Sequence, residues 1–481
     1  MMSPVPRLMN HSRHRFNLAV LISLALQLSG CGNILQSTYH APSVNVPAQW
    51  IAPSISQTAT EPTSPALIND QWWQVFNDPQ LNALINQALN SNSDLAIAAL
   101  KVRIARMRSG IEDTKLAPNI SGGMSANSAG RNLTSGNING NASYGAQAAL
   151  SYEVDLWGKI ARTRDAAHWE AEATELDRQN AALVLIYTTA DLYWRIARDN
   201  QIIKAAEQNI TYTQNILDLA RVKYKAGASS GLDIIQAEQN LAVQKGELGR
   251  KIQQREQHRN ALAVLFDQAP QNRTIELPHL PETPLPIIPI DIPAKVLARR
   301  PDLRAAETRL RSSLANVDAK KASFYPTLNL NANVGTNSPT LSDILKNPIG
   351  ALSASLALPF LQWRQTQLEI NISKVEYEKN VAEFRKALYQ ALVDVEDTFS
   401  AHIQGIDEGK QHALALGYAK RAEQLAEIRY RAGQTSIKEW LDQQSTKRAA
   451  EITLAENRYQ QLSNLMKLYQ ALGGNATANS E

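Results

Sequence analysis

The amino-acid sequence predicts an α+β membrane protein built from two tandem structural repeats. Three observations support this fold class: the same landmarks recur roughly two hundred residues apart, four short segments alternate apolar and polar residues, and very long segments lack proline. Each repeat is expected to contain a helix, two strands, a long helix, a tight turn and a returning helix. With 44% hydrophobic and 20% charged residues among 481, the chain is too charged for a polytopic helical transporter.

Residues 1–30 have the composition of a secretory signal peptide. Three arginines without acidic residues precede an apolar run at positions 16–28, which is shorter than the roughly 20 residues that a transmembrane helix requires. The sequence Leu28-Ser29-Gly30-Cys31 then resembles the bacterial lipobox, which implies lipidation of Cys31, and Gly32 after it implies an outer-membrane address. Residues 31–66 are rich in proline and small polar residues, and we expect a lipidated extended leader without regular structure.

The charge and the cysteine content exclude several classes of function. Removing residues 1–30 lowers the formal net charge from +4 to +1, and no clustered basic face of the kind that binds nucleic acid is evident. We therefore expect no nucleic-acid partner. Cys31 is the single cysteine, so neither an internal disulfide nor a multi-cysteine metal site is available to this chain.

The two repeats share landmarks in the same order. The first repeat is expected at residues 67–268 and the second at 294–472, followed by a disordered tail at 473–481. Seven prolines within residues 269–293 predict a connector, because proline is excluded from helix interiors and central strands. The matched landmarks are Asp94-Leu95 with Asp302-Leu303, Pro118 with Pro326, Trp157 with Trp363, and Ala220–Gly227 with Ala426–Gly433.

Four segments are predicted to be strands, at about 119–128, 141–153, 326–335 and 350–359. In the third, leucine, alanine and valine alternate with asparagine and threonine, which gives one apolar and one polar face. This length and period are typical of transmembrane barrel strands, although two amphipathic hairpins on a soluble core have the same pattern. Four strands cannot close, and lipid does not tolerate open edges, so several copies must share a barrel. Two copies would make an eight-stranded barrel and three a twelve-stranded one, and the residues alone do not determine the number of copies.

Two long helical hairpins complete the repeats. From Lys159 to Ala226 about 68 residues contain neither proline nor glycine, and one continuous helix of that length spans about 100 Å. The second long segment contains no proline after Pro359, and its glycines at 405, 409 and 417 are expected to mark a waist. Each segment leads to a Tyr-x-Ala-Gly turn, with tips near 225–231 and 431–436. The returning helices are expected at Leu232–Phe266 and Ile437–Leu472. Their apolar stripes are narrow, which predicts a single layer of helices that pack side by side and expose both faces to water.

Longer motifs extend over nearly the whole mature chain. They are Gln71–Leu81 (QWWQVFNDPQL), Tyr152–Lys159 (YEVDLWGK), Arg299–Glu307 (RRPDLRAAE) and Phe324–Leu328 (FYPTL), together with both Tyr-x-Ala-Gly turns. With these motifs the chain resembles the TolC-like outer-membrane factor family, in the lipidated branch that includes OprM and NodT-type efflux lipoproteins. The resemblance implies a homotrimer with a shared twelve-stranded outer-membrane β-barrel, four strands per chain, continued by a tapered periplasmic α-helical barrel.

The resemblance also implies a passive exit duct of a tripartite efflux pump, with no catalytic residues, no metal site and no cofactor. Its partners would be a periplasmic membrane-fusion adaptor, an inner-membrane proton-driven (RND-type) transporter and outer-membrane lipid, and its substrates drugs or other small toxic compounds. The family docks its adaptor at the tips of the hairpins. The corresponding residues are Lys225, Ala226, Gly227, Ala228 and Ser229 in the first turn, and Arg431, Ala432, Gly433, Gln434, Thr435 and Ser436 in the second.

The family places its gate just inside this tip, as an inward acidic ring. By spacing from Gly433 that position is Asp442. Three carboxylates around a narrow pore favour cations, whereas an ordinary solvated helix charge is the alternative interpretation. A second, apolar ring of the family falls at Lys438, so a hydrophobic plug is in doubt. Lys438 and Asp442 have the i, i+4 spacing of a helical ion pair, and we hypothesise that this pair lowers the cation selectivity of the gate.

Catalytic and metal-binding patterns are weak. Residues 227–231 have the letters of the Gly-x-Ser-x-Gly nucleophile elbow, but that motif needs a preceding strand, and here helices are predicted on both sides. No histidines outside the signal segment have the spacing of metal ligands. Besides efflux, the sequence is compatible with a duct for type I protein or peptide secretion and with a non-conducting coiled-coil lipoprotein. An enzyme is the remaining alternative, and the absence of a convergent catalytic set disfavours it.

Overall fold

The computed structural model describes residues 35–50, 71–127, 130–131, 138–139, 143–271, 275–286 and 297–474. The signal segment, Cys31 and most of the leader lie outside these described residues. The chain divides into two compact units, and each unit draws on both sequence repeats. As far as they are described, unit 1 comprises Met1–Ser43, Lys101–Thr174 and Ala305–Arg385, and unit 2 comprises Val44–Leu100, Glu175–Arg304 and Lys386–Glu481.

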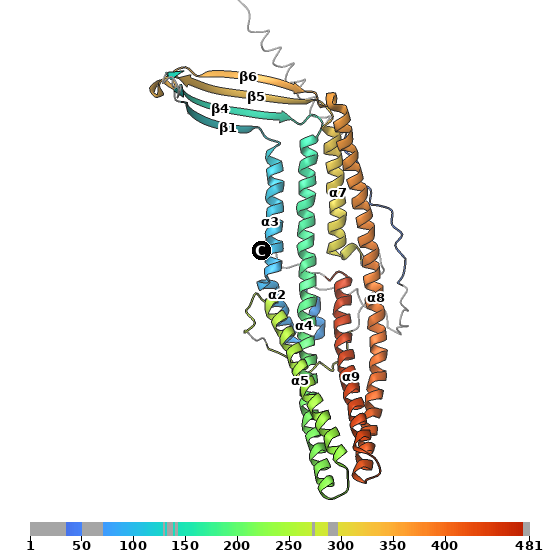
Figure 1. Ribbon diagram of the computed structural model, residues 1–481. Coiled ribbons are helices and arrows are strands. Elements are labelled where there is room, and N and C mark those ends of the chain that lie inside the picture. The colour runs from blue at the N-terminus through green and yellow to red at the C-terminus, as the bar shows by residue number, and fades with distance from the viewer. Residues whose placement is uncertain are drawn as a thin grey trace, which may run out of the picture. The chain divides into compact units, whose positions relative to one another are not determined.

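Unit 1 contains a four-stranded antiparallel sheet in the order β1-β4-β5-β6 (Figure 1). The strands are β1 (Asn119–Asn127), β4 (Ser143–Val154), β5 (Thr327–Ser338) and β6 (Ile349–Ala357). The hairpin of the first repeat pairs with the hairpin of the second along β4 and β5, where Leu150 lies opposite Ala332. Between β1 and β4 in the chain, the sequence analysis missed two short paired strands, β2 (Gly130–Arg131) and β3 (Ile138–Asn139).

The register of the sheet sorts its side chains onto two chemically distinct faces. Successive residues of a strand point to opposite sides, so residues directly opposite each other in neighbouring strands share a face. One row is Ile120, Leu150, Ala332 and Leu352, and the adjacent row is Asn119, Ser151, Asn331 and Ser353. The apolar face is open in the single chain, since Ile120 is 77% exposed and Leu352 is 86% exposed.

The long helices begin shortly after the sheet hairpins. Asp155 caps the start of α4 (Lys159–Lys225), because its carboxylate accepts the backbone amides of Ile160 and Ala161 at 3.0 and 2.8 Å. In the second repeat α8 (Trp363–Arg431) follows β6. The matched tryptophans near the starts of these helices differ in environment: the Trp157 indole donates to the Pro326 carbonyl at 2.8 Å, whereas Trp363 is 64% exposed.

The described part of the leader, residues 35–50, contains no helix or strand. It is held on α7 (Pro301–Ala322) by Ser37, whose backbone amide and hydroxyl donate to the Asp318 carboxylate at 2.6 and 2.7 Å. Lys321 donates to the same carboxylate at 3.0 Å. Asp318 is 2% exposed, so a buried carboxylate fixes a segment that has no regular structure of its own.

Unit 2 is a helical core to which α4 and α8 contribute their later parts. Its other elements are the 3-10 helix η2 (Trp72–Phe76), α2 (Pro79–Ser91), α5 (Gly231–Leu265) and α9 (Ile437–Ala471). The single helix expected before β1 is in fact two, α2 and α3 (Ser93–Thr114). The break is at buried Asn92, whose side-chain oxygen accepts the Leu95 amide at 3.0 Å. Among the described helices, none is both long and apolar enough to cross a membrane.

Glycines in unit 2 bear on two expectations. α8 runs without interruption through Gly405, Gly409 and Gly417. Gly409 instead permits close approach of α9, because a Cβ there would lie 2.5 Å from the Gln461 amide nitrogen. Gln461 also donates to the Gly405 carbonyl at 2.9 Å. At the predicted start of the tail, Gly473 follows α9 with φ of 77°, and buried Gly474 lies against the Trp72 ring.

Candidate functional site

The two predicted tips are helix-ending turns of the same design. The glycine two residues after each long helix has a positive φ, 70° at Gly227 and 76° at Gly433. In the first turn the Gly227 amide donates to the Tyr224 carbonyl at 2.9 Å and the Ala228 amide to the Lys223 carbonyl at 2.8 Å. Equivalent bonds of 3.0 and 2.9 Å form in the second turn. These bonds satisfy backbone carbonyls that a helix end leaves free. The positive φ that they require is a backbone conformation that residues with a Cβ rarely adopt.

The other predicted tip residues lie in the same two turns. Seven of them are exposed, namely Lys225, Ala226, Ala228, Arg431, Ala432, Gln434 and Ser436, while Ser229 and Thr435 are half-buried. Ser229, the serine of the apparent nucleophile elbow, lies between two helices and not after a strand. The turns therefore present two basic side chains together with polar and small apolar ones, on a backbone that their hydrogen bonds hold in place.

A lysine that the sequence analysis missed joins the two turns. The Lys223 ammonium donates to the carbonyls of Tyr430 and Arg431 at 2.5 and 3.2 Å and lies 4.4 Å from the centre of the Tyr430 ring. These carbonyls belong to the end of α8, where a cation is favoured by the helix dipole. The available signal was a basic residue in the last turn of α4, but its counterpart Arg429 instead pairs with Glu439 at 3.1 Å.

Beneath the turns, one hydrophobic cluster packs both hairpins together. Its centre is Trp440, 1% exposed, whose ring centroid lies 5.5 Å from that of Tyr430. Buried Glu423 accepts hydrogen bonds from the Trp440 indole at 3.1 Å and the Tyr212 hydroxyl at 2.6 Å. The cluster members are Ile216, Leu217, Ala220, Ala237, Leu241, Ala426, Tyr430, Ile437, Trp440 and Leu441.

Burial and neighbouring carboxylates affect the two tyrosines of this region in the same direction. Burial, followed by the hydrogen bonds to Glu423 and Glu427, raises the pKa of the Tyr212 hydroxyl far above its usual value. Burial and the nearby Asp233 raise the pKa of Tyr430 to about 12. Both hydroxyls therefore stay protonated at neutral pH and act as hydrogen-bond donors between the hairpins.

The structure brings the two predicted gate residues into contact. The Lys438 ammonium lies 2.5 Å from the Asp442 carboxylate, and the side chains are 66% and 57% exposed. Both line a groove of about 1220 Å³ between α5 and α9, with α4 forming part of its wall. Such an exposed pair adds little stability, so its main physical effect is to cancel the charge that each residue would otherwise place on this surface.

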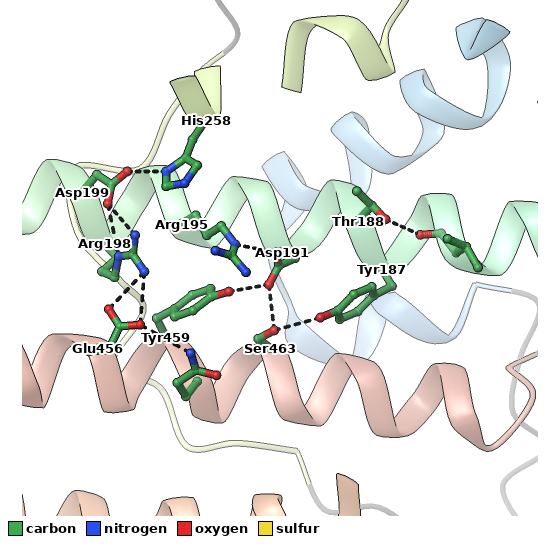
Figure 2. Close-up of polar contacts among 12 residues, drawn as sticks. Tyr187, Thr188, Asp191, Arg195, Arg198, Asp199, His258, Glu456, Tyr459 and Ser463 are labelled. Carbon is green, nitrogen blue, oxygen red and sulfur yellow. Dashed lines mark hydrogen bonds and ion pairs between the residues drawn. The ribbon is translucent and has the colours of Figure 1, made fainter. Parts of the chain in front are cut away.

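A buried polar network links α4 to α9 deeper in unit 2 (Figure 2). The Asp191 carboxylate accepts hydrogen bonds from the Tyr459 hydroxyl at 2.6 Å, the Ser463 hydroxyl at 2.7 Å and Arg195 at 2.6 Å. Burial and the hydrogen bond to Asp191 raise the pKa of Tyr459. Asp191 and Tyr459 are 7% and 1% exposed, so the network carries a charge inside a helical core.

A second group extends this network toward α5 (Figure 2). Asp199 contacts Arg198 at 2.8 Å and His258 at 2.6 Å, and Arg198 also reaches Glu456 at 3.0 Å. Burial opposes ionisation of Asp199, but the hydrogen bonds from His258 and Arg198 outweigh it and hold the pKa of that carboxyl below its usual value. Sequence reasoning missed both groups, because the only sign was a cluster of charges within one turn or two of α4.

Cys31 lies outside the described residues, so the structure does not test its role. Within the described part of the chain, no group of three or more histidine, cysteine, aspartate or glutamate side chains is arranged to hold a metal ion. The features left to carry function are the two tip turns, the paired charges beside them, and the sheet with one apolar and one polar face.

Comparisons with known proteins agree with this architecture. The family model for outer membrane efflux proteins matches twice, over residues 84–266 and 292–474, which confirms the predicted tandem repeat. The pyoverdine export outer membrane protein OpmQ of Pseudomonas putida is 31% identical over 96% of this chain and 98% of its own length. Toxin and drug export protein A of Aggregatibacter actinomycetemcomitans is 27% identical over 95% of this chain and 97% of its own.

A solved structure extends the comparison to the fold. The outer-membrane channel OprN aligns with a TM-score of 0.78 at 26% identity, covering 91% of this chain and 98% of the OprN chain. The predicted fold class is therefore confirmed, and the relatives are outer-membrane export proteins and channels. On the two matches of the family model and the near full-length similarity to OpmQ, this chain belongs to the outer membrane efflux protein family.

Proposed function

We propose that this protein is the exit duct of a tripartite efflux pump, and that three copies share one twelve-stranded barrel continued by a helical tube. In this proposal the duct passes drugs or other small toxic compounds from a periplasmic adaptor and an RND-type inner-membrane transporter to the exterior. It performs no chemistry of its own.

The observation that carries the proposal is the register of the four-stranded sheet. The rows through Leu150 and Ser151 extend across all four strands, and the first is apolar whereas the second is polar. One face therefore suits lipid and the other suits water. Strands β1 and β6 have a neighbour on one side only in the described sheet, and pairing between copies would satisfy their free backbone groups.

The tip turns are proposed as the surface that docks the adaptor. Support comes from the exposed residues of both turns and from Lys223, which holds the first turn against the end of the second long helix. A rigid pair of turns offers a partner one preformed surface, which reduces the entropy lost on binding. Lipidation of Cys31 is proposed as an accessory anchor that leaves the duct itself unchanged.

Single-channel recording in planar bilayers, combined with the mass of the purified assembly, tests the duct. We expect conducting trimers from the wild type and from Cys31→Ala, because the sheet and not the acyl chain would form the membrane-spanning part. Monomers that do not conduct, and that leave the membrane once Cys31 is replaced, would contradict the proposal and favour a structural lipoprotein.

The gate assignment predicts opposite effects from its two charges. Asp442→Ala leaves the Lys438 ammonium unpaired and is expected to reduce the preference of the channel for cations, whereas Lys438→Ala frees the carboxylate and is expected to increase it. With three copies around a narrow pore, we expect shifts of about twofold or more in the cation-to-anion permeability ratio.

The reversal potential in a salt gradient measures this ratio. Lys410→Ala is a matched control, because Lys410 and Asp407 form a similar exposed pair at 2.7 Å on α8. If both gate variants keep the conductance and ion preference of the wild type, Asp442 does not belong to the gate.

Export of peptides is a second candidate, since one relative is named for toxin and drug export. The same duct serves both functions, so the two differ in the transporter that loads it. Cells that lack this protein should lose export of small toxic compounds if the efflux assignment holds. Loss of a secreted polypeptide alone would favour the second candidate.

A further inference from the structure

The polar face of the sheet is almost free of charge. At the paired positions of the four strands this face carries asparagine, serine, glutamine and threonine, interspersed with glycine, alanine and Ile349. Among these positions the only ionisable side chain is Glu153, near the end of β4. Amide and hydroxyl groups both donate and accept hydrogen bonds, so such a face offers contacts to solutes of either charge sign.

Glu153, the ionisable residue of this face, forms an ion pair within unit 1. The Glu153 carboxylate lies 2.5 Å from the ammonium of Lys159, the first residue of α4, and the side chains are 29% and 32% exposed. The two residues line a cavity of about 510 Å³ at the junction between strands and helices. Asn119, Ser151 and Asn329 line the same cavity and belong to the polar face, so the cavity adjoins that face.

A second ion pair lines this cavity. Lys115 lies 2.7 Å from Glu112, both near the end of α3. The cavity therefore combines two carboxylates and two ammonium groups with neutral amide and hydroxyl groups. Its formal charge is zero, because the two charges of each ion pair balance each other.

We propose that the Glu153–Lys159 pair forms a charge-balanced collar where solutes pass from the helical part of the duct to the strands. This inference rests on the proposed function, in which the polar face lines the passage. A ring of unpaired charges would impose a preference for one sign of solute, whereas a ring of pairs imposes none. The strand part of the duct thus accepts cationic, anionic and zwitterionic solutes alike, and sign discrimination is left to other parts of the passage.

Removing one member of the pair at a time tests the collar. Glu153→Gln leaves the Lys159 ammonium uncompensated, and we expect the cation-to-anion permeability ratio to fall about threefold, since three such charges act on one passage. Lys159→Gln is expected to raise the ratio by a similar factor. The double variant removes both charges and should return the reversal potential to that of the wild type.

A second variant tests the neutral face without breaking an ion pair. Asn331→Asp places a carboxylate in the middle of the polar row, and it should raise the ratio by a comparable factor. Lys320→Gln is the matched control, because its pair with Glu369 at 3.3 Å is exposed and neither residue lines the cavity. This control should leave the ratio unchanged.

The outcomes separate the two proposals. A wild-type protein that forms no channels contradicts the proposed function. Channels whose reversal potentials are the same in the wild type, Glu153→Gln, Lys159→Gln and Asn331→Asp contradict the collar alone. A double variant that remains shifted also contradicts it, because the effect would then not come from charge balance.

Discussion

Asp191→Ala is expected to lower the free energy of unfolding of unit 2 by about 3–5 kcal/mol. The carboxylate accepts three hydrogen bonds, and two of the donors, Tyr459 and Ser463, are buried. Alanine would remove the acceptor of the Tyr459 hydroxyl, leave Ser463 with its 3.4 Å contact to the Tyr187 hydroxyl, and create a cavity between α4 and α9. Arg195 is 37% exposed, so water replaces its lost partner and its share of the cost is small.

Denaturant unfolding of the purified protein, followed by tryptophan fluorescence, measures this effect. Trp194 is buried in the same core as Tyr459 and serves as the probe. Asp407→Ala is the matched control, since Asp407 is 63% exposed and its carboxylate pairs with exposed Lys410 at 2.7 Å. If Asp191→Ala shifts the unfolding midpoint no more than Asp407→Ala does, the network has no stabilising role.

Trp440→Ala is expected to lower the free energy of local unfolding at the tip by a similar amount, about 3–5 kcal/mol. The indole is 1% exposed, packs against Tyr430 and donates to buried Glu423. Its removal would leave a cavity in the cluster that joins the two hairpins, and it would take one hydrogen bond from the Glu423 carboxylate, which keeps the bond from Tyr212. Amide hydrogen exchange should therefore accelerate in residues 212–241 and 423–441 while the Asp191 network keeps its protection.

The chain supplies a control on the matched side of the duplication. Tyr224 occupies the position that corresponds to Tyr430, yet it is 52% exposed whereas Tyr430 is 2% exposed. Tyr224→Ala should therefore leave hydrogen exchange at the tip almost unchanged. Equal acceleration in Tyr224→Ala and Trp440→Ala would show that the cluster does not hold the hairpins together.

Much of the local structure follows from the residues alone. The alternation in residues 327–334 predicts a strand, and β5 covers Thr327–Ser338. The Tyr-x-Ala-Gly motifs predict two turns, and both glycines have positive φ. The alternation of a strand, the absence of proline and a glycine at a helix end each depend on interactions within a few residues. They therefore predict local structure independently of the tertiary contacts. The i, i+4 spacing of Lys438 and Asp442 is predictable for the same reason.

Other features depend on contacts between segments far apart in the chain. Lys223 and Arg429 are matched in sequence, yet only Lys223 reaches the end of the opposite helix. The glycines of α8 suggested a waist, but the helix continues and α9 packs closely against Gly409 instead. In each case the structure depends on which distant segment packs against the residue. The local sequence, which is similar in the two repeats, does not contain that information.

The sequence by itself determined the duplication, the strands, the long helices and the two turns, because each of these depends on neighbours along the chain. Only the tertiary structure decided that both repeats contribute to each compact unit, that Asp191 and Tyr459 meet in a core, and that Glu153 is balanced by Lys159. The physical reason is that a charge or a hydroxyl group has the same sequence signal whether it is solvated or paired. Its partner is set by packing, which brings together residues that can lie hundreds of positions apart.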